Sequence, residues 1–346
     1  MTLTINQLLT EAMRLEASDI HLTIGKAPVL RIHGELRSLN SPPLTPDDTK
    51  RMVEEVLPES LKEHLEEMGE ADFSYGIPGV SRFRLNAYYQ RSHLSMAVRV
   101  IPMTIPTLED LHMPGKLRQI AELNQGLVLV TGPTGSGKST TLAAMIQHMN
   151  HHVKKHIITL EDPIEYLHRH HHSIIDQREI GSDTNSFSSG LRAALRQDPD
   201  VILVGEMRDL DTISTAITAA ETGHLVLGTL HTSSATATID RIIDVFEPSQ
   251  QGQIRIQLAS VLAAVVSQRL VPTVDRRGRK AATEILVNNY AVANLIRNEK
   301  IHQIESIMQT SRSEGMHTLE MNIRELLSQK EIDFDEAKPF LRERGM

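Results

Sequence analysis

The stretch GLVLVTGPTGSGKSTT, residues 126–141, joins a short apolar run to a glycine-rich segment that ends in Lys-Ser-Thr. An apolar run without polar alternation is typical of a strand that is buried on both faces. Residues 132–139 match G-x-x-x-x-G-K-S, in which glycines let backbone N–H groups surround phosphate, the lysine supplies a cation and the hydroxyl meets Mg²⁺. The stretch therefore predicts a strand, a phosphate-binding loop and a helix in direct succession.

We expect this loop to bind ATP together with Mg²⁺, because each residue type in the pattern has a task in holding phosphate. The alternative is a glycine-rich turn without a ligand, but the apolar run before the loop and the helical segment after it favour nucleotide binding. The predicted nucleotide-binding residues are Gly132, Pro133, Thr134, Gly135, Ser136, Gly137, Lys138, Ser139 and Thr140.

Three further apolar runs, HIITLED, VILVGE and LVLGTLH, are separated by helical patterns. Such runs are typical of a parallel sheet with crossover helices on both faces, so this part of the chain is predicted to be doubly wound α/β. Beyond about Gln250 the pattern is helical, and residues 291–345 are predicted to form a helical tail.

The part of the chain before residue 102 has a different pattern. Residues 5–15 show helical spacing of apolar side chains, whereas DIHLTIG, PVLRIHGEL and residues 82–101 alternate as strands do. Pro46 is predicted to start a helix that extends to about Leu57. Because Pro102 and Pro106 interrupt both strand and helix, the domain boundary is placed there. The predicted divisions are an N-terminal α/β domain (1–101), a linker (102–109), a nucleotide-binding domain (110–288) and a helical C-terminal region (289–346).

Length and composition limit the possible classes of protein. A chain of 346 residues favours two domains, and the formal charge of −8 argues against a nucleic acid partner. The sequence contains no cysteine, which excludes disulfides and thiolate metal sites. The N-terminus lacks the pattern of a signal peptide, and no apolar run approaches the ~20 residues that span a bilayer. We therefore expect a cytoplasmic protein.

Hydrolysis of ATP requires a group that positions water beside the γ-phosphate. Glu206 follows the VILV run and is the predicted general base or water-positioning residue. Ser139 is the predicted Mg²⁺ ligand, and Glu206 or, alternatively, Glu161 is predicted to hold the ion through water. An ion pair with Arg208 is the alternative role for Glu206. His231 ends the last apolar run and His224 precedes it, so either imidazole is a candidate for a hydrogen bond to phosphate or for a purely local one.

Four motifs in a fixed order resemble one protein family. The segments TGPTGSGKSTT, TLEDPIEY, LRQDPDVILVGEMRD and TAAETGHLVLGTLHT resemble the Walker A, Asp box, Walker B and His box of the type II/IV secretion ATPases. The similarity extends from about residue 19 to about residue 327. The resemblance implies an N-terminal PAS-like domain, a RecA-like P-loop NTPase domain, a homohexameric ring and ATP hydrolysis that performs mechanical work.

The resemblance also implies roles for individual residues. Arginines of the N-terminal domain approach the nucleotide in this family. Arg82, Arg84 and Arg99 lie on matching segments, and Arg84 and Arg99 are the better candidates. The alternative is that these arginines only form a solvated face of a strand. The residues implied in catalysis are Glu161 and Glu165 of the Asp box, Glu206, His224, His231, Arg84 and Arg99.

Within the family, the short chain and the absence of a paired C-x-x-C element point to the branch that retracts type IV pili in twitching motility. The segment AVANLIRNEK, residues 291–300, resembles the AIRNLIRE helix of that branch, from which Ala293 and Asn298 depart. The implied partners are the pilus machinery and its inner-membrane platform protein. The chain would be associated with the membrane only through this platform protein. The retraction interpretation predicts that substituting Leu295 and Ile296 abolishes motility and spares hydrolysis.

Two other functions compete with retraction. One is an assembly ATPase of a related pilus, competence or type II secretion system, and the other is a nucleotide-binding regulator without turnover.

The segment LEDPIEYLHRHHHS, residues 160–173, contains four histidines at positions 168, 170, 171 and 172. A zinc site requires ligands that converge on one point, whereas adjacent side chains of an extended segment point alternately apart. We therefore predict that HRHHH is an exposed, titratable basic loop near a subunit interface and is not a metal site.

Overall fold

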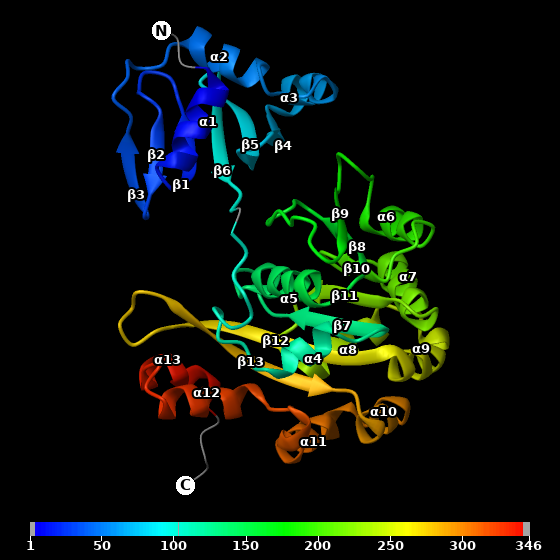
Figure 1. The fold of residues 1–346 in the computed structure, drawn as a ribbon. Coiled ribbons are helices and arrows are strands. Elements are labelled where there is room, and N and C mark those ends of the chain that lie inside the picture. The colour runs from blue at the N-terminus through cyan, green and yellow to red at the C-terminus, as the bar shows by residue number, and fades with distance from the viewer. Residues whose placement is uncertain (1–3, 103, 342–346) are drawn as a thin grey trace. The chain divides into compact units, whose positions relative to one another are not determined.

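The structure, a computed structural model, describes residues 4–102 and 104–341. These residues form two compact units (Figure 1). One comprises the described residues up to Thr104 together with Glu165–Leu167, and the other comprises Ile105–Ile164 and the described residues from His168 onward. Each unit contains its own sheet, which confirms a mixed α/β fold.

The first unit is an antiparallel sheet in the order β3-β2-β1-β6-β5-β4, packed against helices. The helix α2 begins with a capping box, because Thr45 accepts from the N–H of Asp48 and the Asp48 carboxylate accepts from the N–H of Thr45. Pro46 occupies the first helical turn as predicted, but the helix ends at Glu54, before Leu57. The elements are α1 (Ile5–Arg14), β1 (Ala17–Leu22), β2 (Val29–Ile32), β3 (Glu35–Ser38), α2 (Pro46–Glu54), α3 (Lys62–Met68), β4 (Glu70–Ile77), β5 (Ser81–Gln90) and β6 (His93–Val100).

The helices of this unit cover one face of its sheet. Alternate residues Phe83 and Leu85 of β5 are buried in a core with residues of α1, α2 and α3. Arg84, between them, is exposed, because successive side chains of a strand point to opposite faces. The second face of the sheet therefore presents polar side chains.

The second unit is a doubly wound sheet in the order β13-β12-β7-β11-β10-β8-β9. Neighbouring strands are parallel except β12 and β13, which pair antiparallel. Its strands are β7 (Gly126–Thr131), β8 (His156–Glu161), β9 (Ile174–Glu179), β10 (Val201–Val204), β11 (Leu225–Leu230), β12 (Leu262–Pro272) and β13 (Arg279–Val287). Its first helices are α4 (Lys116–Ala121), α5 (Lys138–His152), α6 (Phe187–Ala194), α7 (Leu210–Glu221), α8 (Ala235–Asp244) and α9 (Pro248–Val261).

Helices cover both faces of this second sheet (Figure 1). In β7, Leu127 and Leu129 pack in a core with residues of α6, α7, α8 and α9, whereas Val128 and Val130 pack in a second core with residues of α4 and α5. Both faces of β7 are therefore covered by apolar side chains.

The hairpin β12–β13 was not predicted. The expectation of helix beyond Gln250 is correct for α9, but residues 262–287 form two long strands, and LAAVVSQRLVP mixes apolar and polar residues without a clear period. The strands β4 and β9 were also missed. The expected helical tail is present as α10 (Tyr290–Arg297), α11 (Ile304–Thr310), α12 (Leu319–Ser328) and α13 (Phe334–Ala337), while residues 342–345 of the predicted tail lie outside the described residues. Among the described helices, none has the length and apolar character needed to cross a membrane.

Candidate nucleotide-binding and catalytic site

The register of the second sheet brings the predicted motifs to one edge. Leu160 of β8 pairs with Val204 of β10, Val204 pairs with Gly228 of β11, and Leu230 of β11 pairs with Thr131 of β7. Because the strands are parallel, the segments that follow them all leave the sheet at its carboxyl edge, where ligands bind in doubly wound folds.

The loop between β7 and α5 has a conformation that requires glycine. Gly132, Gly135 and Gly137 have φ angles of +145°, +77° and +88°. A Cβ on Gly132 would lie 2.4 Å from the carbonyl oxygen of Gln268 and 2.6 Å from Oγ of Ser136, so no larger residue fits. The backbone can therefore surround a phosphate chain closely.

The nine predicted nucleotide-binding residues lie in this loop and in the first turn of α5. Lys138 is the first residue of α5, and its Nζ donates to the carbonyl oxygens of Gly132 at 2.9 Å and Pro133 at 3.1 Å. Its ammonium group thus lies over the loop, and Ser139 follows it in the first turn, where backbone N–H groups have no partner within the helix. This arrangement fits the triphosphate of ATP.

Gln268 of β12 fixes the loop from beneath, and sequence reasoning missed it. Its side chain is buried; its Nε2 donates to the carbonyl oxygen of Ser136 at 2.7 Å, and its Oε1 accepts from Oγ1 of Thr141 at 2.8 Å. One residue earlier on the same strand, Ser267 lies 2.7 Å from Thr131 through their hydroxyls. No sequence signal links β12 to the loop, because the partners are more than a hundred residues apart.

The Asp-box residue Glu161 lies at the end of β8 and is held in place. Its Oε1 accepts from Oγ1 of Thr159 at 2.7 Å and from Nε2 of Gln177 at 3.1 Å. Glu165, in the loop that follows, is exposed. Glu179, which sequence reasoning did not single out, is 5% exposed and accepts from the N–H of Ile164 at 3.1 Å, so it fixes the start of the Asp-box loop.

Glu206 lies just beyond β10, with a partner on each side. Its Oε1 is 2.8 Å from Nε2 of His231, which follows β11, and it also accepts from Nε of Arg208. The hydrogen bond to Glu206 raises the pKa of Arg208. The side chain of Glu206 is 21% exposed and that of His231 is 42% exposed, so both remain accessible to a ligand. The structure thus contains both the Arg208 pair and a contact between two predicted catalytic residues.

The second candidate histidine, His224, lies at the opposite edge of the sheet. It precedes β11, and its Nδ1 is 3.0 Å from the carbonyl oxygen of Ala219 and 3.2 Å from Oγ1 of Thr222. The six residues of β11 separate it from His231 by about 20 Å. Within one chain, the structure does not bring His224 together with the other candidates.

The candidate arginines lie on the open face of the first sheet. Arg99 pairs with Asp19 at 3.2 Å and Arg84 pairs with Asp72 at 3.8 Å, while Arg82 is half-buried on the same strand as Arg84. A shallow pocket of about 190 Å³ lies here, lined by Asp19, His21, Asp72, Arg84, Asn86, Ala97, Val98 and Arg99.

The histidine loop after the Asp box differs in part from the prediction. His170, His171 and His172 are exposed as expected, and the ring of His171 stacks on that of His151 with centroids 4.5 Å apart. The prediction of an exposed, titratable side chain is wrong for His168. Its Nδ1 is buried, and burial lowers the pKa of His168 to about 4. Its imidazole is neutral near pH 7 because its neighbours exclude water. In residues 4–102 and 104–341, no group of three or more His, Asp or Glu side chains is arranged to hold a metal ion.

The fold and the edge site together define a P-loop NTPase with a RecA-like doubly wound domain. A sequence model described as "Type II/IV secretion system protein" matches residues 1–338. The chain belongs to this family, and it is a nucleotide-binding ATPase.

Named relatives point to one branch of the family. The chain is 45% identical to the Pseudomonas aeruginosa "Type IV pilus retractation ATPase PilT", covering 96% of this chain and 97% of that protein. It is 47% identical to a "Twitching motility protein" of Neisseria gonorrhoeae, over 91% and 86% of the two chains. The crystal structure of "the Pilus Retraction Motor PilT and Bound ADP" superposes with a TM-score of 0.91 at 48% identity, covering 99% of this chain and 98% of that one.

Proposed function

We propose that this protein is a motor ATPase that retracts type IV pili and so drives twitching motility. The similarity to PilT of Pseudomonas aeruginosa along almost the whole of both chains supports this proposal. The single structural observation behind the ATPase chemistry is the contact between Glu206 and His231 at the edge that also presents the P-loop.

In the proposed mechanism, the P-loop binds the triphosphate through backbone N–H groups and Lys138 exchanges its carbonyl partners for phosphate oxygens. Ser139 and, through water, Glu206 would hold Mg²⁺, whose positive charge would offset the charge that develops on the phosphates. Glu206 orients the attacking water and accepts its proton, and His231 holds the Glu206 carboxylate in position. His224 has no nucleotide contact within its own chain in this mechanism, because it lies at the opposite edge of the sheet.

We further propose that the N-terminal arginines would reach the bound nucleotide when ATP binding closes the two domains. Arg84 and Arg99 are paired with carboxylates on a solvated face, and such pairs contribute only about 0–1 kcal/mol each. A phosphate group can therefore displace Asp72 and Asp19 at small cost and form stronger charge-assisted hydrogen bonds. Closure on ATP and reopening after hydrolysis would turn phosphate contacts into domain movement.

We propose that six copies form a ring that acts on the inner-membrane platform protein of the pilus machinery. The helix α10, which contains most of the AVANLIRNEK segment, exposes Asn294 and Arg297. Leu295 packs against the core and Ile296 is fully buried, so substituting them would destabilise the fold and would not test the surface. Asn294→Ala with Arg297→Ala is the better double variant, and it should abolish motility while hydrolysis continues.

The enzyme proposal is tested by steady-state phosphate release from the full-length protein. Mg²⁺-dependent hydrolysis is expected in the unaltered chain, and Glu206→Gln should reduce kcat by about 100-fold or more. Glu221→Gln, an exposed acid in the second unit, serves as the matched control and should retain full activity. Absence of hydrolysis, or full activity in Glu206→Gln, would favour the regulator without turnover.

Deleting the gene in its host separates retraction from assembly. Retraction predicts cells that keep surface pili and lose twitching, since pili would be extended but not withdrawn. Cells without surface pili would instead identify the chain as an assembly ATPase.

A further inference from the structure

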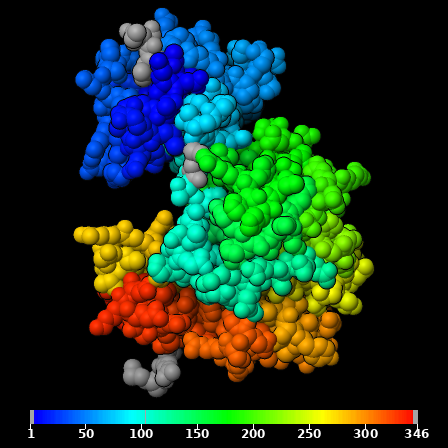
Figure 2. All heavy atoms as spheres, in the orientation of Figure 1, coloured from blue at the N-terminus to red at the C-terminus, as the bar shows by residue number. Residues whose placement is uncertain are grey.

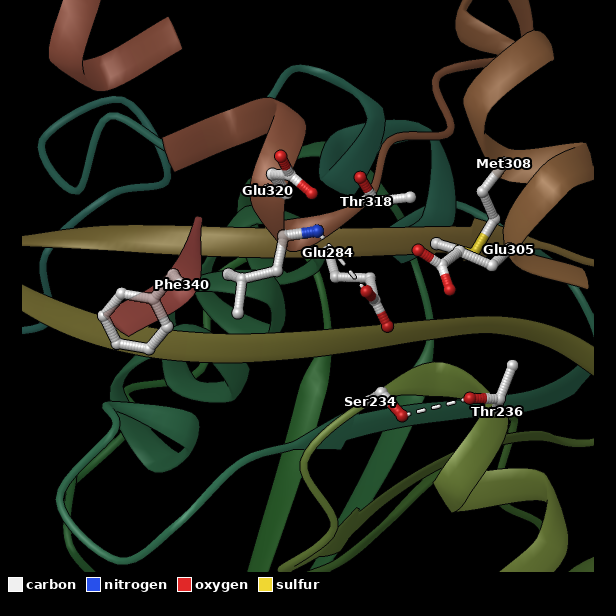
Figure 3. Close-up of a pocket in the computed structure, with 9 residues that line it drawn as sticks. Ser234, Thr236, Glu284, Glu305, Met308, Thr318, Glu320 and Phe340 are labelled. Carbon is white, nitrogen blue, oxygen red and sulfur yellow. Dashed lines mark hydrogen bonds between the residues drawn. The ribbon is translucent and has the colours of Figure 1, made fainter. Parts of the chain in front are cut away.

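The β12–β13 hairpin contacts the catalytic edge at a second place besides Gln268. Glu284 of β13 is largely buried, and Figure 3 shows its side chain in a pocket of about 260 Å³ between Ser234 and Thr318. Its two carboxylate oxygens accept from the N–H of Ala235 at 2.7 Å and from the N–H of Leu319 at 3.3 Å. One carboxylate therefore caps the first turns of two helices, α8 and α12.

The bond to the N–H of Ala235 bears on the candidate site, because Ala235 follows the short loop that begins at His231. Ala235 is the first residue of α8, and His231 is the residue directly after β11. The same loop receives a second contact from the hairpin, since Nη2 of Arg269 donates to the carbonyl oxygen of Ser233 at 3.3 Å. The four-residue loop from His231 to Ser234 is thus fixed at its far end by β12 and β13.

His231 is in turn the partner of Glu206, with Nε2 2.8 Å from Oε1. A shift of the loop would move this imidazole, and a displacement of about 1 Å at a reacting group can cost about 100-fold in rate. The P-loop does not depend on this path, because Gln268 holds it through separate bonds to Ser136 and Thr141.

We propose that Glu284 is a positioning residue for ATP hydrolysis, which acts by fixing the loop that orients His231 against Glu206. This inference rests on the proposed catalytic role of Glu206. The bond from Glu284 to Leu319 also joins this loop to α12, so the C-terminal helical region is mechanically connected to the catalytic histidine and not only to the core.

A change at Glu284 should affect turnover and not nucleotide binding. In Glu284→Gln the amide oxygen can replace one carboxylate oxygen, but the NH₂ group then faces a second N–H donor. We expect kcat to fall about tenfold, while the KM for ATP and the affinity for ADP change by less than about twofold.

The adjacent residue Thr283 provides the matched control. Its hydroxyl is 2.9 Å from Nε2 of His317, and its N–H donates to Asn322, so it contacts the α12 region but not the His231 loop. Thr283→Val should lower the Tm, as loss of a buried hydrogen bond does, and leave kcat unchanged.

The decisive measurement is a double-mutant cycle with the full-length protein, with kcat as the readout. If Glu284 acts through His231, then His231→Ala together with Glu284→Gln should be no slower than His231→Ala alone. Equal kcat in Glu284→Gln and the unaltered chain, multiplicative effects in the double variant, or normal kcat in His231→Ala would each overturn the proposal. Absence of Mg²⁺-dependent hydrolysis in the unaltered chain would overturn the proposed function as well, so the two failures are distinguishable.

Discussion

The two sheets of this protein present polar groups in opposite ways. The second sheet is apolar on both faces and places its reactive side chains at one edge, where Gln268, Thr159 and His231 fix their neighbours by hydrogen bonds. The first sheet is covered on one face and presents Arg84 and Arg99 across the other. Arg84 pairs with the exposed Asp72, and Arg99 pairs with the partly buried Asp19, which also pairs with Arg31. The edge is therefore organised before a ligand arrives, whereas the open face consists of groups that can change partners.

This difference leads to a general expectation for substitutions. Changes at the edge should affect both stability and chemistry, because buried donors and acceptors lose their partners. Changes on the open face should affect chemistry alone, because exposed ion pairs contribute little to folding.

The largest effect is expected at the edge, for Lys138→Ala. The variant removes the cation that we propose to meet the β- and γ-phosphates, and loss of one such group costs about 100- to 1,000-fold in kcat. Phosphate release together with ATP binding by fluorescence measures the effect. Lys154→Ala, at a lysine that follows α5, is the control and should behave as the unaltered chain does. Substantial turnover in Lys138→Ala would show that the edge is not the site of hydrolysis.

Arg99→Ala tests the open face. We expect kcat to fall about 10- to 100-fold, because the guanidinium would no longer stabilise charge on the transferred phosphate. The Tm should change by less than about 2 °C, since the side chain of Arg99 is 71% exposed. Asp19→Asn removes its carboxylate partner and keeps the arginine, so hydrolysis should stay within about twofold. A lower kcat in Asp19→Asn than in Arg99→Ala would contradict the exchange of partners.

Gln268→Met tests whether a hydrogen-bonded residue at the edge of the second sheet supports both stability and ATP binding. The change keeps the size of the side chain but leaves the Ser136 carbonyl and the Thr141 hydroxyl without a partner, which should destabilise the fold by about 2–4 kcal/mol. A looser loop should raise the KM for ATP about tenfold. Thr141→Val removes only one of the two bonds and should produce a smaller change in both quantities. Urea unfolding and steady-state kinetics measure them, and an unchanged KM with lowered stability would show that Gln268 serves the core alone.

The positions of the candidate residues at one edge of the sheet could be predicted from the sequence, because their determinants are local. A strand, a glycine loop and Lys138 follow one another directly, and parallel strands must bring Glu161, Glu206 and His231 to the same edge. The same reasoning showed that His224 belongs to the start of its strand, which the register of β11 confirms.

What the sequence did not predict depends on partners far along the chain. Gln268 and Glu284 lie on a hairpin whose residues mix polar and apolar types, and their roles appear only when β12 is placed beside β7. For Glu206 the sequence leaves a catalytic role and an ion pair with Arg208 as alternatives, and it does not predict the contact with His231, since spacing alone does not determine side-chain direction. His168 has the same residue type as its exposed neighbours, so only its surroundings in the fold reveal its burial.

The smallest effect is expected for His168, a buried polar group of the second unit whose backbone N–H donates to Oε1 of Gln177 at 2.8 Å. Burial lowers the pKa of His168 to about 4, whereas an unfolded chain titrates its histidines near 6.5. Between these values the unfolded state binds more protons, so the free energy of unfolding should rise with pH and be lost as pH falls from 6.5 towards 4. His168→Phe should remove about 2 kcal/mol of that pH dependence and leave kcat at pH 7 unchanged. Urea unfolding at pH 7 and pH 5 measures the difference, and His302→Gln, at an exposed histidine, should keep the original slope. If His168→Phe also keeps the slope, the imidazole is solvated in the folded protein; if it lowers kcat, the region that organises the edge extends further from the P-loop than the two-sheet comparison implies.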